Sequence, residues 1–348
     1  MQNEEKRDIK SMSREEMAEC FAEIGEPRFR AGQVFAWLQN GLASFNDMTN
    51  IPMALRAKLA GEFYITVPAL LRKLTSAEDG TAKLLWGLRD GEAVETVVMK
   101  YRHGNTVCIS TQVGCRMGCA FCASTLGGLV RNLTPSEMLD EVLYSEREFG
   151  ERLSNIVLMG IGEPLDNFDN VMRFLELVNH PDGRNFGMRH ISLSTSGIKE
   201  GIDKLAEYNL QLTLSVSLHA PDDETRSRIM PVNRSCGVDS LLASCRRYFE
   251  KTGRRVSFEY AMIRDVNDRP HHAALLAERM RRTGSHVNLI PLNTVEERKF
   301  QPSEPSRVRA FQKTLEDAGI SVTVRRRLGG DIDAACGQLR RRAQEKLQ

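Results

Sequence analysis

The feature that most constrains the fold is a regular alternation of strand-like and helix-like segments that begins near residue 106. Short apolar runs rich in β-branched residues alternate with stretches whose apolar residues recur at helical spacing. Strands separated by helices predict parallel pairing with right-handed crossovers. Six such units fit an α/β fold, either a partial (β/α)6 barrel or an open doubly wound sheet. The predicted strands are 106–111, 155–160, 190–195, 212–218, 256–263 and 286–292, with a shorter one at 320–324, and the predicted helices are 135–149, 168–178, 198–208, 240–251, 271–282 and 305–318.

The residues before this pattern have a different hydrophobic periodicity. Residues 13–62 read as short helices separated by turn signals. Strand-like runs at 82–88 and 94–99 follow, and an Asp-Gly turn dipeptide lies between them. The predicted domain limits are 1–75 for a small helical N-terminal accessory domain, 76–105 for a short β extension or linker, 106–340 for the barrel with a C-terminal cysteine loop, and 341–348 for a basic tail.

Composition excludes several classes of protein. Hydrophobic residues make up 41% of the chain and charged residues 27%, which is ordinary for a globular protein and unlike a disordered, collagenous or disulfide-stapled chain. No apolar run approaches the roughly 18 residues of a membrane-spanning helix. The first 26 residues also lack the apolar stretch of a signal peptide. We therefore expect a cytoplasmic protein without a membrane partner.

The charge distribution leaves a nucleic-acid partner open. The formal net charge of +2 is too small to indicate a polyanionic partner by itself. Arginines cluster at 325–327 and 340–342, and clustered arginine is what contact with phosphates requires. Such runs are also common on solvated faces, so composition alone supports both interpretations.

Three of the eight cysteines lie close together in the segment 115–122 (CRMGCAFC), just after the first predicted barrel strand. In a reducing compartment, thiols clustered in this way indicate metal or redox chemistry rather than a structural disulfide. Three thiolates are one ligand short of a closed zinc site or an all-cysteine iron-sulfur cluster. Either a distant side chain completes the site, or the fourth position is open for chemistry.

This spacing, set after the first strand of a (β/α)6 pattern, resembles the radical S-adenosylmethionine (SAM) superfamily. The resemblance implies a 4Fe-4S cluster held by Cys115, Cys119 and Cys122, with one iron open to the amino and carboxylate groups of SAM. The cluster and SAM would supply a 5′-deoxyadenosyl radical, while the protein supplies position and excludes water.

The ends of the other predicted strands agree with that resemblance. The segment 160–164 (GIGEP) resembles the loop that binds the SAM amino group in this superfamily, which implicates Gly162 and Glu163. In parallel α/β folds the carboxyl ends of the strands form the site, so further polar side chains are expected there. Taken singly, each of them is more often a cap or turn residue. The candidates for SAM binding at this rim are Ser194, Ser217, Leu218, His219 and Asn293.

A closer resemblance is carried by the segments 107–115 (VCISTQVGC), 330–339 (GDIDAACGQL) and 94–96 (VET). They are similar to the RlmN/Cfr family of RNA adenine methyltransferases, over nearly the whole chain. The resemblance implies that Cys336 takes a methyl group from one SAM, and that a second SAM yields the radical that activates this S-methyl group. It also implies that Glu95 accepts a proton and that Cys108 attacks the Cys336 sulfur, leaving a Cys108–Cys336 disulfide.

Features around these cysteines suit the implied chemistry. Carbon 2 of adenine has no lone pair to attack a sulfonium methyl, so direct methyl transfer from SAM would fail there. Gly329 and Gly330 precede Cys336 and are expected to make its loop mobile. The arginines at 325–327 would favour both a thiolate and RNA phosphates. Cys108 lies seven residues before the cluster loop and is expected to face the same mouth.

Within the family, methylation occurs at adenine carbon 2 or, in antibiotic-resistance enzymes, at carbon 8. Pro164 resembles the carbon-2 branch. The implied substrates are the peptidyl-transferase-centre adenosine of 23S rRNA, in free or partly assembled RNA, and the adenosine 3′ of the anticodon in tRNA. Loops of RNA can present such a base to a pocket. The resemblance also implies an electron donor such as a flavodoxin.

Two rival interpretations stay open at the level of sequence. One is a non-catalytic, zinc-bearing RNA-binding module, which would be colourless. The other is a radical SAM enzyme that uses the radical directly on its substrate and has no need of Cys336.

Overall fold

A single mixed sheet of ten strands forms the centre of the protein, in the order β14-β13-β12-β11-β10-β9-β6-β5-β4-β3. The computed structural model describes residues 6–281 and 283–339. From β6 to β14 every neighbouring pair is parallel, and the spatial order follows the chain without reversal. A doubly wound sheet would reverse its order at a switch point, so the partial-barrel prediction is confirmed. The parallel strands are β6 (Gly104–Cys108), β9 (Leu153–Leu158), β10 (Ile191–Thr195), β11 (Thr213–Ser217), β12 (Val256–Met262), β13 (His286–Pro291) and β14 (Ser321–Val324).

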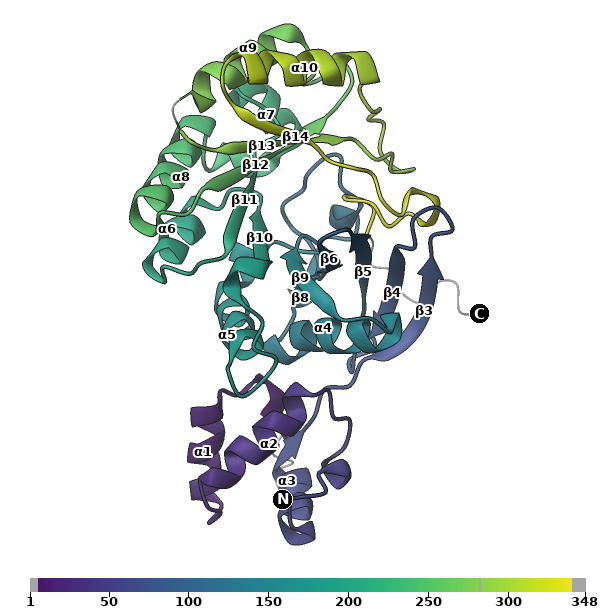
Figure 1. The fold of residues 1–348 in the computed structure, drawn as a ribbon, viewed down its shortest axis with the longest axis vertical. Helices are drawn as coiled ribbons and strands as arrows, with labels where there is room; N and C mark the ends of the chain where they lie inside the picture. Colours follow the sequence, from purple (N-terminus) through teal and green to yellow (C-terminus); the bar gives the residue numbers. More distant parts are fainter. Residues whose placement is uncertain (1–5, 282, 340–348) are drawn as a thin grey trace.

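Helices cover the outer face of this sheet, and Figure 1 shows them on the side away from the C-terminal segment. The main hydrophobic core lies between the helices and the strands and includes Ile156, Leu193, Val216 and Phe258, each almost fully buried. Several of these strands alternate buried apolar residues with small polar ones, as in ISLST of β10 and TLSVS of β11, and this period of two made them recognisable in the sequence. The helices are α4 (Pro135–Phe149), α5 (Phe168–Asn179), α6 (Lys199–Glu207), α7 (Asp223–Ile229), α8 (Val238–Thr252), α9 (Pro270–Met280) and α10 (Pro305–Asp317).

The β extension continues the barrel sheet through three antiparallel strands, β5 (Ala93–Tyr101), β4 (Ala82–Gly87) and β3 (Ala69–Thr75). The predicted strands 82–88 and 94–99 are confirmed as β4 and β5. Strand β3 lies in a segment predicted as part of the helical domain, so that expectation is corrected. Because β3 is an exposed edge strand, it carries no alternating apolar pattern.

The N-terminal residues have a hydrophobic core of their own, to which Phe21, Phe35, Leu38 and Phe63 contribute. A capping box between Ser13 and Glu16 begins the first helix. No described helix is long and apolar enough to cross a membrane. The predicted basic tail at 341–348 lies outside the described residues. The elements here are β1 (Arg7–Asp8), α1 (Arg14–Glu23), α2 (Phe29–Gln39), α3 (Met53–Glu62) and β2 (Phe63–Tyr64).

Candidate active site

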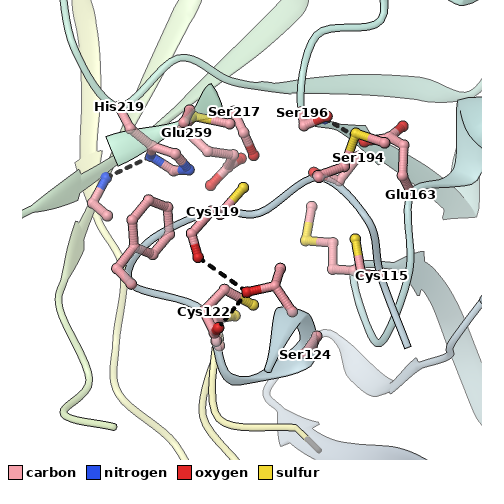
Figure 2. Close-up of a pocket in the computed structure, with 18 of the residues that line it drawn as sticks. Cys115, Cys119, Cys122, Ser124, Glu163, Ser194, Ser196, Ser217, His219 and Glu259 are labelled. Carbon is pink, nitrogen blue, oxygen red and sulfur yellow. Dashed lines mark hydrogen bonds between the residues drawn. The ribbon is translucent and has the colours of Figure 1, made fainter. Parts of the chain in front are cut away.

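The carboxyl ends of the parallel strands surround a cavity of about 1000 Å³ that is partly open to solvent. We call it the rim cavity. Figure 2 shows the three clustered cysteines around it, with serines from β10 and β11 opposite them. The predicted site residues that line it are Cys115, Cys119, Cys122, Gly162, Glu163, Ser194, Ser217, His219, Asn293 and Cys336.

The cysteine loop runs between two short strands, β7 (Gln112–Gly114) and β8 (Leu129–Asn132), and close backbone contacts hold it. Gly114 has φ of +76°, and a Cβ atom there would lie 1.9 Å from the Gly128 oxygen, so only glycine fits. The Thr125 hydroxyl donates to the carbonyl oxygens of Cys119 (3.3 Å) and Cys122 (3.0 Å). The thiols therefore sit on a loop whose own backbone is tied at several points.

Burial disfavours the thiolate form of the three clustered cysteines. Burial raises the pKa of Cys115 to about 12 and also raises the pKa values of Cys119 and Cys122. Buried thiolates need a positively charged partner, which a bound metal centre supplies. In the described part of the chain, no three His, Cys, Asp or Glu side chains gather closely enough to hold a metal ion. The ligand roles of the three cysteines stay a prediction.

The loop after β9 approaches the cysteine loop so closely that glycine is required. Gly162 has φ of +111°, and a Cβ atom there would lie 2.7 Å from Cβ of Gln112. The buried Glu163 carboxylate accepts hydrogen bonds from the backbone N–H groups of Leu165 (3.0 Å) and Ser196 (2.6 Å). Burial raises the pKa of Glu163. The Glu163 side chain therefore fastens this loop to the end of β10.

Two buried side-chain oxygens face the rim cavity: Asn293 Oδ1 has no hydrogen-bond partner among the described residues, and Ser196 Oγ lies beside the Glu163 carboxylate. Buried polar atoms are nearly always satisfied, by protein, water or a ligand. A cofactor with ammonium and hydroxyl groups, such as SAM, fits this wall. The Nδ2 group of Asn293 donates to the Cys336 carbonyl oxygen at 3.2 Å.

His219 presents a neutral imidazole to the rim cavity. The Ala261 N–H donates to Nδ1 of His219 at 2.9 Å, so the ring proton belongs on Nε2. Burial, assisted by the Arg226 charge, lowers the pKa of His219 to about 3. Its predicted neighbour Leu218 lines no cavity found in the described residues: the side chain is fully buried, and its carbonyl oxygen accepts from Arg226 Nε at 3.0 Å.

Sequence reasoning missed two charged residues of the site, Arg226 and Glu259. The fully buried Arg226 guanidinium donates to the carbonyl oxygens of Ser196 (2.6 Å) and Ser217 (3.0 Å), which joins the ends of β10 and β11. Glu259 lines the rim cavity from β12 and accepts from Asn288 at 2.8 Å. Glu259 could have been identified from the sequence, because it lies inside a strand that is buried on both faces. Burying a charged side chain is costly unless it has a partner or a function.

A second cavity, of about 700 Å³, adjoins the first, and Cys336 borders both. We call it the cysteine-pair cavity, because Cys108 and Cys336 both line it. Arg325 also borders both cavities, and the nearby Cys336 thiol is the main cause that raises the Arg325 pKa above its ordinary value. Burial and Cys336 together raise the pKa of Cys108. The other walls are largely apolar and include Val97, Met99, Met159 and Leu328.

The sequence predicted a disulfide between Cys108 and Cys336 and a catalytic role for Glu95. Cys108 and Cys336 are free thiols, so the expected disulfide is not present. Glu95 lies on β5, buried, with its carboxylate 3.5 Å from the Lys83 ammonium, and it lines neither cavity. Its role as a proton acceptor stays a prediction.

Comparisons with known proteins agree with this architecture. The family model described as "Radical SAM superfamily" matches residues 109–277, and the model described as "Ribosomal RNA large subunit methyltransferase N-terminal domain" matches residues 7–65. A relative from Desulforamulus reducens, named "Probable dual-specificity RNA methyltransferase RlmN", is 49% identical over 99% of both chains. A relative of the same name from Symbiobacterium thermophilum is 53% identical over 97% of this chain and 92% of its own length.

A solved structure supports the same relationship. The crystal structure of a radical SAM methyltransferase from Sphaerobacter thermophilus superposes with a TM-score of 0.92 and is 43% identical. The match covers 97% of this chain and all of the other chain. The likeness therefore extends over the barrel, the β extension and the N-terminal helices together.

Proposed function

The chain belongs to the RlmN family of radical SAM RNA methyltransferases, and on that premise we propose that it methylates carbon 2 of adenosine in RNA. The proposed substrates are one adenosine of the peptidyl-transferase centre in 23S rRNA and the adenosine 3′ of the anticodon in tRNA. The observation that carries the proposal is the position of Cys336, whose side chain borders both the rim cavity and the cysteine-pair cavity.

We assign the rim cavity to the cofactors. Cys115, Cys119 and Cys122 would hold a 4Fe-4S cluster, and Ser196 Oγ and the unpartnered Asn293 Oδ1 would face SAM. When bound, the cluster and SAM supply the one-electron chemistry that can activate an unreactive C–H bond. A one-electron donor, such as a flavodoxin, must reach this cavity.

Cys336 would carry the methyl group that reaches the RNA. Its thiolate is a good nucleophile toward a sulfonium methyl, whereas carbon 2 of adenine has no lone pair with which to attack. The Arg325 guanidinium beside it stabilises a thiolate. Because Cys336 borders both cavities, a short movement would take its sulfur from the cofactor to the base.

Cys108 would release the product. Attack of Cys108 Sγ on Cys336 Sγ forms a disulfide and breaks the carbon–sulfur bond to the RNA. The electron pair of that bond passes to the product carbon, which takes up a proton to become a methyl group. The unpaired electron that radical addition leaves on the adduct would return to the oxidised 4Fe-4S cluster, so that only the two thiols are oxidised overall. An external thiol or dithiol reductant must then restore both thiols. Removal of the ring proton needs a base, for which Glu95 is the candidate that the family resemblance supplies.

The experiment that tests this function reconstitutes the protein anaerobically with iron and sulfide, then adds SAM, a reductant and an rRNA fragment that spans the peptidyl-transferase loop. Nucleosides are read by mass spectrometry. We expect 2-methyladenosine from the wild type and from Cys245→Ala, a control that removes a buried cysteine of α8 outside both cavities. 8-Methyladenosine would place the enzyme in the carbon-8 branch. Absence of any methylated adenosine from a reducible cluster would overturn the substrate assignment.

A further inference from the structure

The β extension contains two turns that look alike locally but differ in what they hold. The β3–β4 turn contains Asp79 and the β4–β5 turn contains Asp90, and each is followed by a glycine with positive φ. In both turns, Oδ1 of the aspartate accepts from the backbone N–H two residues later, Thr81 at 2.9 Å and Glu92 at 3.1 Å. Both aspartates therefore form the same local turn.

The two turns differ in the partner of the other carboxylate oxygen, Oδ2. Asp79 Oδ2 accepts from the backbone N–H of Gly329 at 2.8 Å, across 250 residues of sequence. Asp90 Oδ2 instead accepts from the Arg131 side chain at the edge of the cysteine loop. Of these two carboxylates, it is that of Asp79 that bonds the segment leading to Cys336.

Further contacts from the same hairpin hold that segment. The Asp331 side chain accepts from the Ala77 N–H at 3.1 Å. The Lys83 ammonium donates to the Asp333 carbonyl oxygen at 3.0 Å. Figure 1 shows the yellow C-terminal loop beside the turn that joins β3 and β4. Polar contacts at 329, 331 and 333 therefore tie one side of the Cys336 loop to the extension.

Gly329 makes this docking possible. It has φ of +61°, and a Cβ atom there would lie 2.9 Å from Cγ2 of Thr81 and 2.8 Å from Cβ of Ala334. The absence of a side chain lets the loop approach the turn. The close packing explains why glycine stands at this position, and the expected mobility of the loop stays a prediction.

The other side of the Cys336 loop is tied to the cysteine loop. The Ala123 N–H donates to the Gly337 carbonyl oxygen at 2.8 Å, and the Ser124 hydroxyl donates to the Leu339 carbonyl oxygen at 2.9 Å. Cys336 therefore lies between two anchors, one on the β extension and one on the cysteine loop.

We propose that Asp79 is a positioning residue that holds the Cys336 loop through its bond to Gly329, so that the cysteine sulfur stays between the two cavities. For the chemistry of Cys336 the inference rests on the proposed function, but the position of the loop can be measured without it. A displacement of about 1 Å in a reacting group can lower a rate by about a hundredfold. The three-stranded extension is then part of the catalytic machinery rather than only an edge of the sheet.

The test compares Asp79→Ala with Asp90→Ala in the full-length, cluster-loaded protein. Hydrogen exchange of peptides that cover 329–339 is measured by mass spectrometry without SAM or RNA. We expect faster exchange of this segment in Asp79→Ala and wild-type exchange in Asp90→Ala. Methyl transfer from SAM to Cys336, read on the tryptic peptide, should slow by about tenfold to a hundredfold in Asp79→Ala, with SAM affinity unchanged.

Equal exchange of 329–339 in the wild type and in a folded Asp79→Ala variant would overturn the inference. If Asp79→Ala fails to fold, Asp79→Asn replaces it, because the amide keeps the acceptor toward Thr81 and removes the charge. A loss of SAM affinity that matches the loss of rate would also overturn it, since the whole rim would then have moved. Faster exchange in Asp79→Ala, together with an unmethylated Cys336 in the wild type, would uphold the loop contact and refute the proposed function.

Discussion

The two cavities of this protein are built in different ways, and the difference separates what the barrel contributes from what the appended segments contribute. The rim cavity is formed by the carboxyl ends of β9 to β13 and the cysteine loop, and it contains buried side-chain oxygens such as Asn293 Oδ1, which has no protein partner among the described residues. The cysteine-pair cavity is formed mainly by β5 and the C-terminal loop, and three arginines, the half-buried Arg325 with the exposed Arg326 and Arg327, border it beside apolar side chains. The first suits a polar cofactor and the second a flat base beside two sulfurs.

This comparison teaches that binding of the cofactor and delivery of the methyl group should be separable by mutation. Several residues border both cavities, Arg325 and Asn293 among them, and Cys336 is the one proposed to carry the methyl group from one cavity to the other. Changes at the rim should alter cofactor binding first, and changes in the cysteine-pair cavity should alter RNA methylation with the cofactors still bound.

The largest expected effect is that of Cys336→Ala. RNA methylation should fall by about a thousandfold or more, because no other thiol replaces the methyl carrier. SAM binding and iron content should stay at wild-type levels. Cys119→Ala supplies the opposite case, in which iron content falls together with activity. Turnover by Cys336→Ala at the wild-type rate, measured by nucleoside mass spectrometry, would favour an enzyme that uses its radical directly on the substrate.

Arg226→Met should damage the rim cavity and the fold together. The change leaves the buried carbonyl oxygens of Ser196 and Ser217 without their donor, and we expect a loss of about 3–5 kcal/mol in the free energy of unfolding. SAM affinity should fall by about tenfold or more. The control Arg247→Met removes an exposed ion pair with Asp203 and should cost about 1 kcal/mol or less. Equal losses in the two variants, by urea unfolding, would contradict the role of Arg226.

The pH dependence of stability should carry the signature of His219. Its pKa in the folded protein is lowered to about 3, below the ordinary value near 6.5, so the unfolded state binds more protons between these two values. Stability is therefore unaffected by this group above pH 6.5 and decreases as the pH falls toward 3. Between pH 6.5 and 5 the loss should be about 2 kcal/mol. In urea unfolding of the cluster-free protein, His219→Gln should reduce this slope, and an unchanged slope would argue against a neutral, buried imidazole.

The smallest expected effect is that of Ser196→Ala. The Glu163 carboxylate beside Ser196 Oγ keeps two backbone N–H donors without it, so loss of the hydroxyl should change the unfolding free energy by about 1 kcal/mol or less. SAM affinity should nevertheless fall, by about threefold to tenfold. Ser244→Ala is the matched control: the Ser244 hydroxyl on α8 donates to Asp203 on α6 at 2.7 Å and lies outside both cavities. This variant should lose stability and keep its SAM affinity. Unaltered SAM affinity in Ser196→Ala would remove this atom from the cofactor wall.

How much of this molecule is predictable from its sequence depends on what buries each segment. The parallel strands were located because short runs with alternating, buried apolar residues recur between helical segments, and the topology then placed Ser194, Ser217 and His219 at one rim. Strand β3 and helix α7 were not located, because one is exposed and the other is a short polar segment. Local pattern has little power for elements of this kind.

The site itself shows the same limit. The cysteine motif has a specific spacing, so its loop was found directly. Arg226 and Glu259 were missed because a lone charged residue in a helix or strand usually faces solvent, and only the tertiary structure shows that these two are buried. Cys108 and Cys336 are far apart in the sequence but line the same cavity. Only the family resemblance predicted that they act together.

The measurement that tests the central claim most directly uses Cys108→Ala under turnover conditions with SAM, reductant and the rRNA fragment. Without Cys108 the product cannot be released from Cys336, so the proposed chemistry predicts a covalent protein–RNA adduct. Nuclease digestion and tandem mass spectrometry should place a modified adenosine on the Cys336 peptide, and Cys108→Ala combined with Cys336→Ala should give no adduct. Free methylated RNA in wild-type yield from Cys108→Ala, with no adduct, would contradict the account.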